Sequence, residues 1–429
     1  MKYLTLLQDL DYRGSQRVAQ NYSLGMKALG HEVRVLTINA LGSRTEYLAK
    51  EGIICSCIAI QPECIDEVAN WSPDIIHIHR AGIYEEKINQ IIVELKNRVN
   101  PIVIETSIFS RVDYKISPNI IDIHLHLTKW CFWKWRQWSK SLHYKPLGTI
   151  LPYSIICSLF YRSSTQDILD CKNRLGIPQN NFVFGRIGAN CEAKWHPIII
   201  SSFKHIAETN DDISLLLVSP PPSIVNLVKN LPVHIKAKVF VTPKIENDGE
   251  LRLLYSSMNV MLHASRIGES FGIVLAESLL CETPVIVLSS PTKDNSQVEI
   301  IKHQQTGLVV NNAASFIQAM QEIYNCQDKA REFGENGRQD ILANYDNEFV
   351  CSRLDLLCKL LINNRQESDS ITTRLLNENN FITEVPNFMN VLNGFYGKVP
   401  VHEQLIAKLV HHPQIYRFYA NTILAAKLN

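Results

Sequence analysis

Two glutamates, eight residues apart, are the groups in this sequence best suited to bind a polyhydroxylated ligand. Glu269 follows a predicted strand and a glycine-containing turn, and Glu277 lies a little over two helical turns further along a predicted helix. Because each carboxylate oxygen accepts hydrogen bonds from neighbouring hydroxyls, the pair could hold a sugar or a ribose. The structural alternative makes Glu277 a solvated helix residue and Glu269 a partner of the helix dipole.

The helix that carries Glu277 is predicted to begin between Ser270 and Gly272, directly after Glu269. Ser270 is the expected N-cap, because its hydroxyl can accept from a free backbone N–H group of the first turn. The other free N–H groups and the positive end of the helix dipole favour an anion. The sequence therefore predicts a ligand that carries both hydroxyls and an anionic group.

Two cations precede this stretch in the same predicted domain. Arg186 follows Gly185 at the end of a predicted strand, and Lys194 enters the next helix. Arginine holds phosphate oxygens as a fork and lysine acts as a point charge, so the two cations suit a diphosphate. One such cation alone is more often a surface charge, but two at the strand ends of one domain favour a binding site.

Parallel strands would position these residues, and the sequence predicts two sets of such strands. Runs that are apolar on both faces, such as Ile75–Ile78, indicate strands covered by helices on both sides. A helix over Gly14–Leu29, which ends before Gly30, completes the first βαβ unit. The first set of strands is Lys2–Gln8, Glu32–Ile38, Ile53–Ile58, Ile75–His79, Ile102–Thr106 and Asp122–Thr128, and the second is Phe182–Ile187, Ile213–Ser219, Lys238–Thr242, Asn259–Ala264 and Pro284–Leu288.

The alternation predicts an α/β protein with two facing Rossmann-like domains and a helical C-terminal extension. We expect domains over residues 1–155 and 156–345, with a linker at Leu151–Asp170. Helices of residues 346–429 follow, and the first of them should pack back toward the N-terminal domain. In such sheets ligands bind at the carboxyl ends of the strands. Predicted helices include Leu251–Ser257, Ile273–Leu280, Asn347–Ile362 and Val401–Val410.

The composition excludes several classes of protein. The formal net charge is +1, so no global field recruits nucleic acid, and we expect no nucleic-acid partner. The eleven cysteines are scattered without paired CxxC motifs, which favours reduced thiols in the cytosol. No apolar run reaches the roughly 18–20 residues that span a bilayer. We expect no signal peptide and a cytoplasmic protein, with the inner face of a membrane as the alternative location.

The order of these motifs resembles one enzyme family. Gly268–Glu277 is similar to the E-x7-E signature of the retaining glycosyltransferases of the group 1 (family 4) class, which have the two-Rossmann GT-B fold. Gly185-Arg186 with Lys194 resembles that family's G-R…K element. The resemblance extends from about residue 1 to residue 345, through Arg13–Arg17, Asp74–His79, and the segment from Glu299 to Val310.

The resemblance implies the following roles. The N-terminal domain would face the acceptor and the C-terminal domain would hold a nucleotide-diphosphate sugar. The catalytic residues would be Glu269 on the donor-sugar hydroxyls and Arg186 and Lys194 on the diphosphate. The donor-binding residues would be Glu277 on the ribose, Phe271 and Gly272 through their backbone N–H groups, Ser270, Ser265, Gly14 and His79.

Three segments depart from the family pattern, and one of them is Ser219-Pro220-Pro221-Pro222, which replaces a usual glycine-rich turn. Arg13 stands where the N-terminal turn usually has a glycine, and Thr106-Ser107 follows a strand after which many relatives carry a histidine. His79 and His77 are the candidate substitutes, with satisfied core histidines as the alternative. Asp9-Leu10-Asp11 mimics the metal-binding D-x-D motif of another glycosyltransferase fold but lies outside that motif's context. We therefore expect no metal ligands and no required cofactor.

The expected reaction moves a sugar, with retention, from a nucleotide-diphosphate sugar to a hydroxyl of a glycan, a lipid-linked acceptor or a glycoconjugate. Arg186 and Lys194 would stabilise the charge that develops on the diphosphate. Two alternatives remain open, namely a sugar-nucleotide epimerase of the same fold and a catalytically silent protein that binds nucleotide sugars.

One further segment, residues 129–140, contains four of the six tryptophans of the chain. On a helix, Lys129, Arg136 and Lys140 share a narrow face, and the aromatic residues cover a broad arc. The segment is either a packed helix with a solvated basic edge or a peripheral membrane contact that docks a lipid-linked acceptor.

Overall fold

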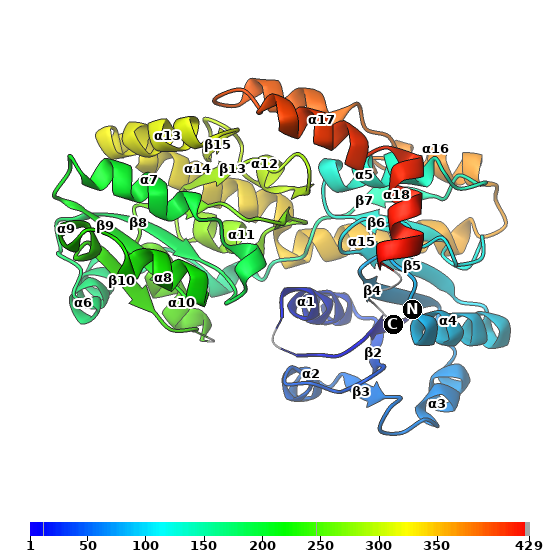
Figure 1. Ribbon diagram of the computed structural model, residues 1–429. Helices are drawn as coiled ribbons and strands as arrows, with labels where there is room; N and C mark the ends of the chain where they lie inside the picture. The colour runs from blue at the N-terminus through cyan, green and yellow to red at the C-terminus, as the bar shows by residue number, and fades with distance from the viewer. Residues whose placement is uncertain (12, 246, 425–429) are drawn as a thin grey trace. The chain divides into compact units, whose positions relative to one another are not determined.

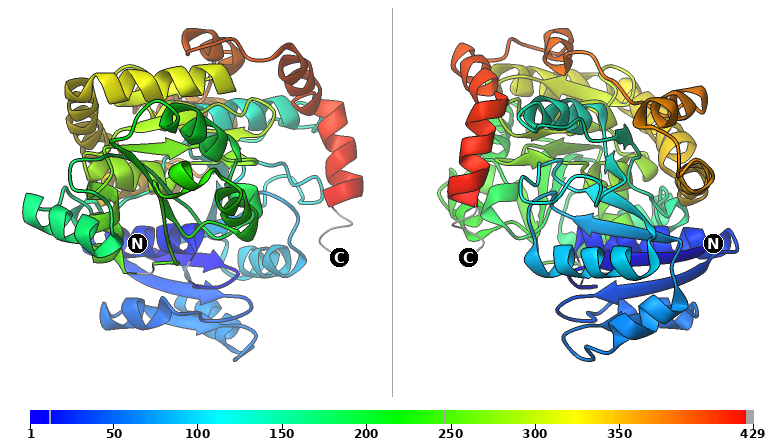
Figure 2. Two further views of the ribbon diagram at one scale, coloured as in Figure 1. Left: turned by 60° about the vertical axis from the view of Figure 1, so that its left-hand side comes forward. Right: turned by 90° about the vertical axis from the view of Figure 1, so that its right-hand side faces the viewer.

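The computed structural model describes residues 1–11, 13–245 and 247–424 of the chain, so residues 425–429 of the predicted helical extension lie outside the described residues. The chain forms two compact units. The N-terminal unit comprises Met1–Ile156, Tyr345–Asn387 and Lys408–Asn429, and the C-terminal unit comprises Cys157–Asn344 and Phe388–Ala407. Each unit has its own parallel sheet, and the ribbon views show helices on both faces of each sheet (Figures 1 and 2).

The sheet of the N-terminal unit has seven strands in the order β3-β2-β1-β4-β5-β6-β7, and all the neighbours are parallel. Six of these strands lie where the sequence predicts them, and β7 was not predicted. The strands are β1 (Lys2–Leu7), β2 (Glu32–Thr37), β3 (Ile54–Cys57), β4 (Ile75–Arg80), β5 (Ile102–Ser107), β6 (Ile123–His126) and β7 (Gly148–Ile150).

Alternation along these strands sends side chains to the two faces of the sheet. Leu4 and Leu6 of β1 pack in one core cluster with side chains of α3 (Cys64–Trp71) and α4 (Glu86–Val99). Tyr3 and Thr5, one position away, are buried too, and the Thr5 hydroxyl is 2.8 Å from the Ser23 hydroxyl of α1 (Gly14–Ala28). Both faces are therefore apolar because helices cover both, as the sequence predicts.

The remaining helices of the N-terminal unit come from both ends of the chain. The early ones are α2 (Thr45–Lys50) and α5 (Lys129–Ser139), and the late ones are α15 (Asn347–Asn363), α16 (Asp369–Glu378) and α18 (Pro413–Tyr419), followed by a short π-helix at Ala420–Leu424. Helix α15 packs on α1, and the Asn347 side chain of α15 donates to the backbone oxygen of Asn21 at 2.8 Å. A helix from the C-terminal part of the chain, α15, thus packs in the N-terminal unit on a helix that lies more than 300 residues earlier in the sequence.

The sheet of the C-terminal unit repeats the same topology with six parallel strands in the order β10-β9-β8-β11-β13-β15. Five were predicted, and β15 was not. They are β8 (Phe182–Ile187), β9 (Ile213–Val218), β10 (Val239–Thr242), β11 (Val260–His263), β13 (Val285–Leu288) and β15 (Gly307–Val310). A separate pair, β12 (Gly268–Glu269) and β14 (Asp294–Asn295), was also missed.

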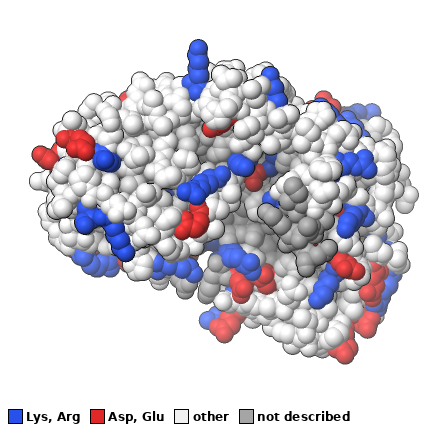
Figure 3. Space-filling model, in the orientation of Figure 1, with Lys and Arg blue, Asp and Glu red and all other residues white. Residues whose placement is uncertain are grey.

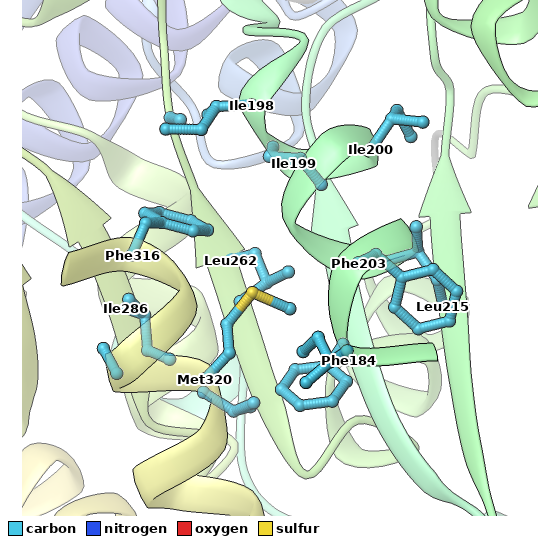
Figure 4. Close-up of a cluster of buried hydrophobic side chains, with 14 of the residues drawn as sticks. Phe184, Ile198, Ile199, Ile200, Phe203, Leu215, Leu262, Ile286, Phe316 and Met320 are labelled. Atoms are coloured by element: carbon cyan, nitrogen blue, oxygen red, sulfur yellow. The ribbon is translucent and has the colours of Figure 1, made fainter. Parts of the chain in front are cut away.

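A large core cluster of the C-terminal unit lies between one face of this sheet and its helices, and Figure 4 shows the part formed with two of them. Phe203 of α7 (Ile198–Ala207) and Met320 of α13 (Ala313–Asn325) are fully buried against strand residues such as Phe184 and Leu262. The other helices are α6 (Thr165–Leu175), α8 (Pro222–Lys229), α9 (Val233–Lys236), α10 (Asp248–Ser256), α11 (Ile273–Leu280), α12 (Gln297–Ile300) and α14 (Gln327–Tyr345), with 3-10 turns at Cys157–Leu159, Glu192–Lys194 and Phe388–Gly394. Helix α17 (Val401–Val410) begins in this unit, and its last three residues belong to the N-terminal unit.

One predicted boundary is wrong. Helix α6 begins at Thr165, inside the segment Leu151–Asp170 that the sequence predicts as a linker. The hydroxyl of Ser164 accepts from the backbone N–H of Asp167 and caps this helix, so the serines that suggested a linker include a helix start. Among the described helices, none is both long and apolar enough to cross a membrane.

Candidate functional site

The candidate site lies where the strand order of the C-terminal unit reverses. Strands β8 and β11 are neighbours in the sheet, although β9 and β10 separate them in the chain. In open α/β sheets the crevice at the carboxyl ends of such a pair is the usual ligand site. Arg186 lies near the end of β8, and His263 ends β11 with Glu269 six residues further on.

Glu269 is held by two side chains. Its Oε2 accepts from Lys194 Nζ at 2.7 Å, and its Oε1 lies 3.2 Å from His263 Nε2. Only 8% of Glu269 is exposed, so the carboxylate is oriented inside the protein. The two residues that the sequence assigns to sugar and diphosphate, Glu269 and Lys194, therefore form one ion pair. Lys194 lies in the 3-10 turn Glu192–Lys194, and the helix it was expected to enter begins at Ile198.

The charge states of this group follow from its surroundings. Burial alone would raise the pKa of Glu269, but Lys194 and His263 together lower it to about 2. Burial, helped by the Arg186 charge, lowers the pKa of His263 to about 4, so the imidazole is neutral at pH 7. A neutral His263 can donate from Nε2 to the ionised Glu269. At neutral pH the carboxylate is ionised and can only accept hydrogen bonds.

Arg186 has the most unusual environment in the site. Its guanidinium is buried and lies over the Trp195 ring, 5.3 Å from the ring centroid. Nη2 donates to the backbone oxygen of Lys194 at 2.9 Å, whereas Nε and Nη1 have no acceptor among the described residues. Burial lowers the pKa of Arg186 to about 10, so it stays charged at pH 7. A buried cation with two unused donors favours an anionic ligand.

The turn before α11 depends on two glycines. Gly268 has φ +68°, and a Cβ there would lie 1.6 Å from the backbone oxygen of Asp294 on the neighbouring strand. Gly272 has φ +94° and is the N-cap of α11, which begins at Ile273. The prediction that Ser270 caps this helix is therefore wrong, because the left-handed Gly272 delays the helix start and no side chain caps it.

The other predicted donor-binding residues of this unit lie close by. Ser265 is buried and donates to the backbone oxygen of Gly268 at 3.1 Å, which supports the turn. Phe271 is fully buried, and Ser270 is half-buried. Glu277 is buried on α11 and accepts from the Tyr255 hydroxyl of α10 at 2.9 Å. Glu277 is thus not the solvated helix residue of the structural alternative.

Gly14 and His79, which the resemblance also assigns to donor binding, belong to the N-terminal unit. Gly14 begins α1, and Arg13 before it pairs with Asp9 at 2.5 Å. His79 is buried in β4, its Nε2 has no partner among the described residues, and its pKa falls to about 3 because of burial. His77 is a satisfied core histidine, since its Nε2 lies 2.7 Å from the Thr106 hydroxyl. The roles of Gly14 and His79 stay predictions.

No group of three or more metal-binding side chains occurs in the part of the chain that the structure describes. Asp9 and Asp11, the residues of the D-x-D mimic, both lie within 4 Å of the Arg13 guanidinium. A cation already balances these two carboxylates. Whether the reaction needs a metal stays a prediction.

A cavity of about 760 Å³ opens in the N-terminal unit at the carboxyl ends of β1, β2 and β4. Three side chains form a hydrogen-bonded row in its wall, in which Asn39 donates to Gln8 at 2.7 Å and Gln8 donates to Glu85. Burial raises the pKa of Glu85. The other polar lining residues are carboxylates, lysines, phenols and an amide, namely Glu86, Asp113, Lys87, Lys115, Tyr84, Tyr114 and Asn421, and Ala81, Ile83, Val112 and Ala420 complete the lining. Such a lining offers both donors and acceptors to a hydroxyl-rich ligand.

The aromatic segment, residues 129–140, forms helix α5, and its aromatic side chains pack inside the N-terminal unit. Trp130, Trp133, Trp135 and Trp138 are all buried, and Trp138 stacks on Tyr416 of α18 with a centroid distance of 3.7 Å. Of the two alternatives for residues 129–140, the packed helix fits these tryptophans, because α18 and its neighbours cover them, and a membrane contact of this segment stays a prediction. Lys129 and Lys140 at the ends of the segment are exposed.

Sequence reasoning missed three residues of the C-terminal site. His263, Tyr255 and Gln297 contact Glu269 or Glu277, and Gln297 Oε1 accepts from the backbone N–H of Glu269 at 3.2 Å. His263 carried a signal, since it is a polar residue at the end of an apolar strand. Tyr255 and Gln297 carried none, because only the tertiary fold brings them to the site.

The fold has known counterparts among solved structures. Sucrose-phosphate synthase from Thermosynechococcus elongatus is 16% identical with a TM-score of 0.63, over 84% of this chain and 99% of that one. Anabaena Alr3699/HepE in complex with UDP is 15% identical with a TM-score of 0.65, over 83% and 98%. A glycosyltransferase from Rickettsia africae is 15% identical with a TM-score of 0.69, over 84% and 99%. The chain has the GT-B fold of glycosyltransferases.

The family follows from the sequence of the C-terminal unit. Residues 167–340, which contain Arg186, Lys194, Glu269 and Glu277, match the family described as "Glycosyl transferases group 1". This part of the chain is a group 1 glycosyltransferase domain. N-acetyl-alpha-D-glucosaminyl L-malate synthase of Bacillus anthracis is 29% identical over 197 residues, which are 45% of this chain and 49% of that enzyme. The match thus spans about half the length of that relative.

Proposed function

We propose that this protein is a retaining glycosyltransferase that moves a sugar from a nucleoside diphosphate sugar to a hydroxyl group of an acceptor. The buried Arg186, with two donors that no described residue satisfies, is the observation that carries the proposal. A diphosphate supplies the negative charge and the oxygen acceptors that this guanidinium lacks. Lys194 adds a second cation at the same strand ends.

The donor sugar is the part of the ligand that Glu269 recognises. Its carboxylate is ionised and oriented by Lys194 and His263, so it can accept hydrogen bonds from sugar hydroxyls. Glu277, fixed by Tyr255, accepts from the ribose of the nucleotide. Neighbouring structures in complex with UDP and with UDP-glucose support a nucleotide sugar as the donor.

In the proposed reaction, the bond between the anomeric carbon and the diphosphate oxygen breaks, and a bond from the acceptor oxygen forms on the same face of the sugar. The acceptor proton goes to a phosphate oxygen of the leaving group, so no enzyme nucleophile is needed. Negative charge grows on the diphosphate as the bond breaks. Arg186 and Lys194 stabilise that charge because they are already in position.

The acceptor is proposed to bind in the N-terminal unit, in the cavity lined by Gln8, Glu85 and Asp113. Arg80 and Asn89 hold the Asp113 carboxylate at 3.3 and 3.2 Å, so this wall is rigid. A volume of about 760 Å³ is in the range of small-molecule sites. A glycan, the glycan part of a lipid-linked acceptor or another hydroxyl-rich molecule fits such a lining.

A ligand screen followed by a product assay tests the proposal. Nucleoside diphosphate sugars that bind should raise the melting temperature, whereas the matching monophosphates should do so much less. With an acceptor, transfer releases one nucleoside diphosphate per glycoside, and the anomeric configuration of the product is read by NMR. Interconversion of nucleotide sugars without such release would identify an epimerase, and binding without turnover over a broad acceptor panel would identify a silent binding protein.

A further inference from the structure

Helices α17 and α18 expose an unusual number of large apolar side chains. Seven of the 23 exposed large apolar residues among those described lie within the 19 positions 401–419. Contiguous exposed apolar surface is rare on proteins that have no partner for it. The seven residues are Val401, Leu405, Ile406, Leu409, Ile415, Phe418 and Tyr419.

On α17 these side chains form a stripe. Ala407 is buried and Glu403 and Val410 are half-buried, so these three residues mark the side of the helix that packs on the protein. At 100° per residue, Val401, Leu405 and Leu409 follow one another on the side away from it. They are 72%, 58% and 56% exposed, and no described element covers them.

Helix α18 also has one buried side and one exposed apolar side. Tyr416 is buried and stacks on Trp138 of α5, which fixes the inner side of α18. Phe418 lies two positions further along, on the opposite side, and is 70% exposed. The aromatic helix α5 is therefore already covered, and α18 carries the exposed apolar surface of this region.

The charges near α17 and α18 indicate which kind of partner would bind this apolar surface. Lys398, Lys408 and Arg417 are exposed, whereas Glu403 is the one carboxylate in residues 398–422 and lies on the packed side of α17. Elsewhere on the face seen in Figure 3, cations and carboxylates are interspersed. A second copy of this chain would bring these cations against one another. An anionic lipid surface instead offers a charge complement to the cations and an apolar layer to the stripe.

We propose that the N-terminal unit binds the surface of an anionic bilayer through α18 and the last turn of α17, with Leu409 and Phe418 in the boundary between headgroups and acyl chains and Leu405 one turn earlier on the same helix α17. Phenylalanine and leucine on one face with lysine and arginine beside it are typical of helices that lie in the membrane interface. This inference does not depend on the proposed sugar transfer. It places the membrane contact in residues 401–419, whereas the sequence alone suggested residues 129–140.

Vesicle flotation of the full chain tests the inference. Wild-type protein should float with vesicles of phosphatidylglycerol and phosphatidylcholine and not with phosphatidylcholine alone. Leu405→Glu and Phe418→Glu should each lower partition at least tenfold. Lys398→Gln and Lys408→Gln should lower it about fivefold per cation removed, which corresponds to about 1 kcal/mol each.

Val233→Glu is the matched control, because Val233 is an 80% exposed valine on another helix, α9. It should float as wild type does, and all variants should keep the wild-type melting temperature. If a glutamate variant melts early, Leu405→Ser replaces it. Wild-type protein that stays off anionic vesicles, or an equal loss in Val233→Glu, would overturn the inference. A dimer in light scattering that Leu405→Glu converts to a monomer, without vesicle binding by wild type, would assign the stripe to a second copy instead.

Discussion

Replacement of Arg186 by methionine separates a ligand-binding arginine from a structural one. Methionine has a similar length and no charge, so Arg186→Met removes the guanidinium but keeps much of the volume over Trp195. The variant loses the hydrogen bond from Nη2 to the Lys194 oxygen, but it also removes a buried cation with two unsatisfied donors. We expect these effects to offset one another, so that stability changes by no more than about 1–2 kcal/mol.

Ligand binding should change far more. Each hydrogen bond from a charged donor contributes about 1.5–3 kcal/mol, so loss of Nε and Nη1 as donors to a diphosphate costs about 3–6 kcal/mol. The dissociation constant should therefore rise about 100-fold or more. Isothermal titration calorimetry with UDP, ADP and GDP, and urea unfolding of the same samples, give both quantities.

Arg331→Met is the control for this experiment, because Arg331 belongs to the same unit and its side chain is 75% exposed. It should bind nucleoside diphosphates as wild type does. A folded Arg186→Met that binds them equally well would refute the assignment of the diphosphate to this guanidinium. Loss of more than about 4 kcal/mol of stability would mark Arg186 as structural.

Three further predictions concern the same unit. The folded pKa of Glu269 is about 2, below its ordinary value of 4.5. The free energy of unfolding of wild type, measured with urea, should therefore fall by about 3 kcal/mol between pH 4.5 and pH 2. The free energy of unfolding of Glu269→Gln should fall less over the same range, because glutamine does not titrate. Gly268→Ala should destabilise the turn or abolish folding, since its Cβ would meet the Asp294 oxygen, and an unchanged melting temperature would contradict this. Activity should persist in excess EDTA, and loss that magnesium or manganese restores would show that a metal is required.

Most of the fold could be predicted from local patterns. Strands with β-branched residues on both faces, such as β4 and β9, are recognisable because a parallel sheet is covered on both sides. The bounds of α11 and α17 match the predicted Ile273–Leu280 and Val401–Val410. The missed strand β7 has only three residues, too few for a clear pattern, whereas β15 has four, as many as several strands that were predicted, so length does not explain why it was missed.

The details of the site depended on contacts that no local pattern encodes. The start of α11 is set by the left-handed Gly272, so the serine at position 270 misled the cap prediction. The contact of Tyr255 with Glu277 joins two helices, and the burial of the α5 tryptophans depends on Tyr416, 278 residues after Trp138. The cavity beside Gln8 and Glu85 forms only when three strand ends meet.

Turnover by a folded Glu269→Ala variant shows whether this carboxylate takes part in sugar transfer. Rates of nucleoside diphosphate release and of glycoside formation are compared for wild type, Glu269→Ala and Glu332→Ala, an exposed glutamate of the same unit, with circular dichroism on each sample. We expect wild type and Glu332→Ala to form glycoside and nucleoside diphosphate in equal amounts, and the folded Glu269→Ala to lose most of this activity. Near-normal transfer by Glu269→Ala would contradict this expectation.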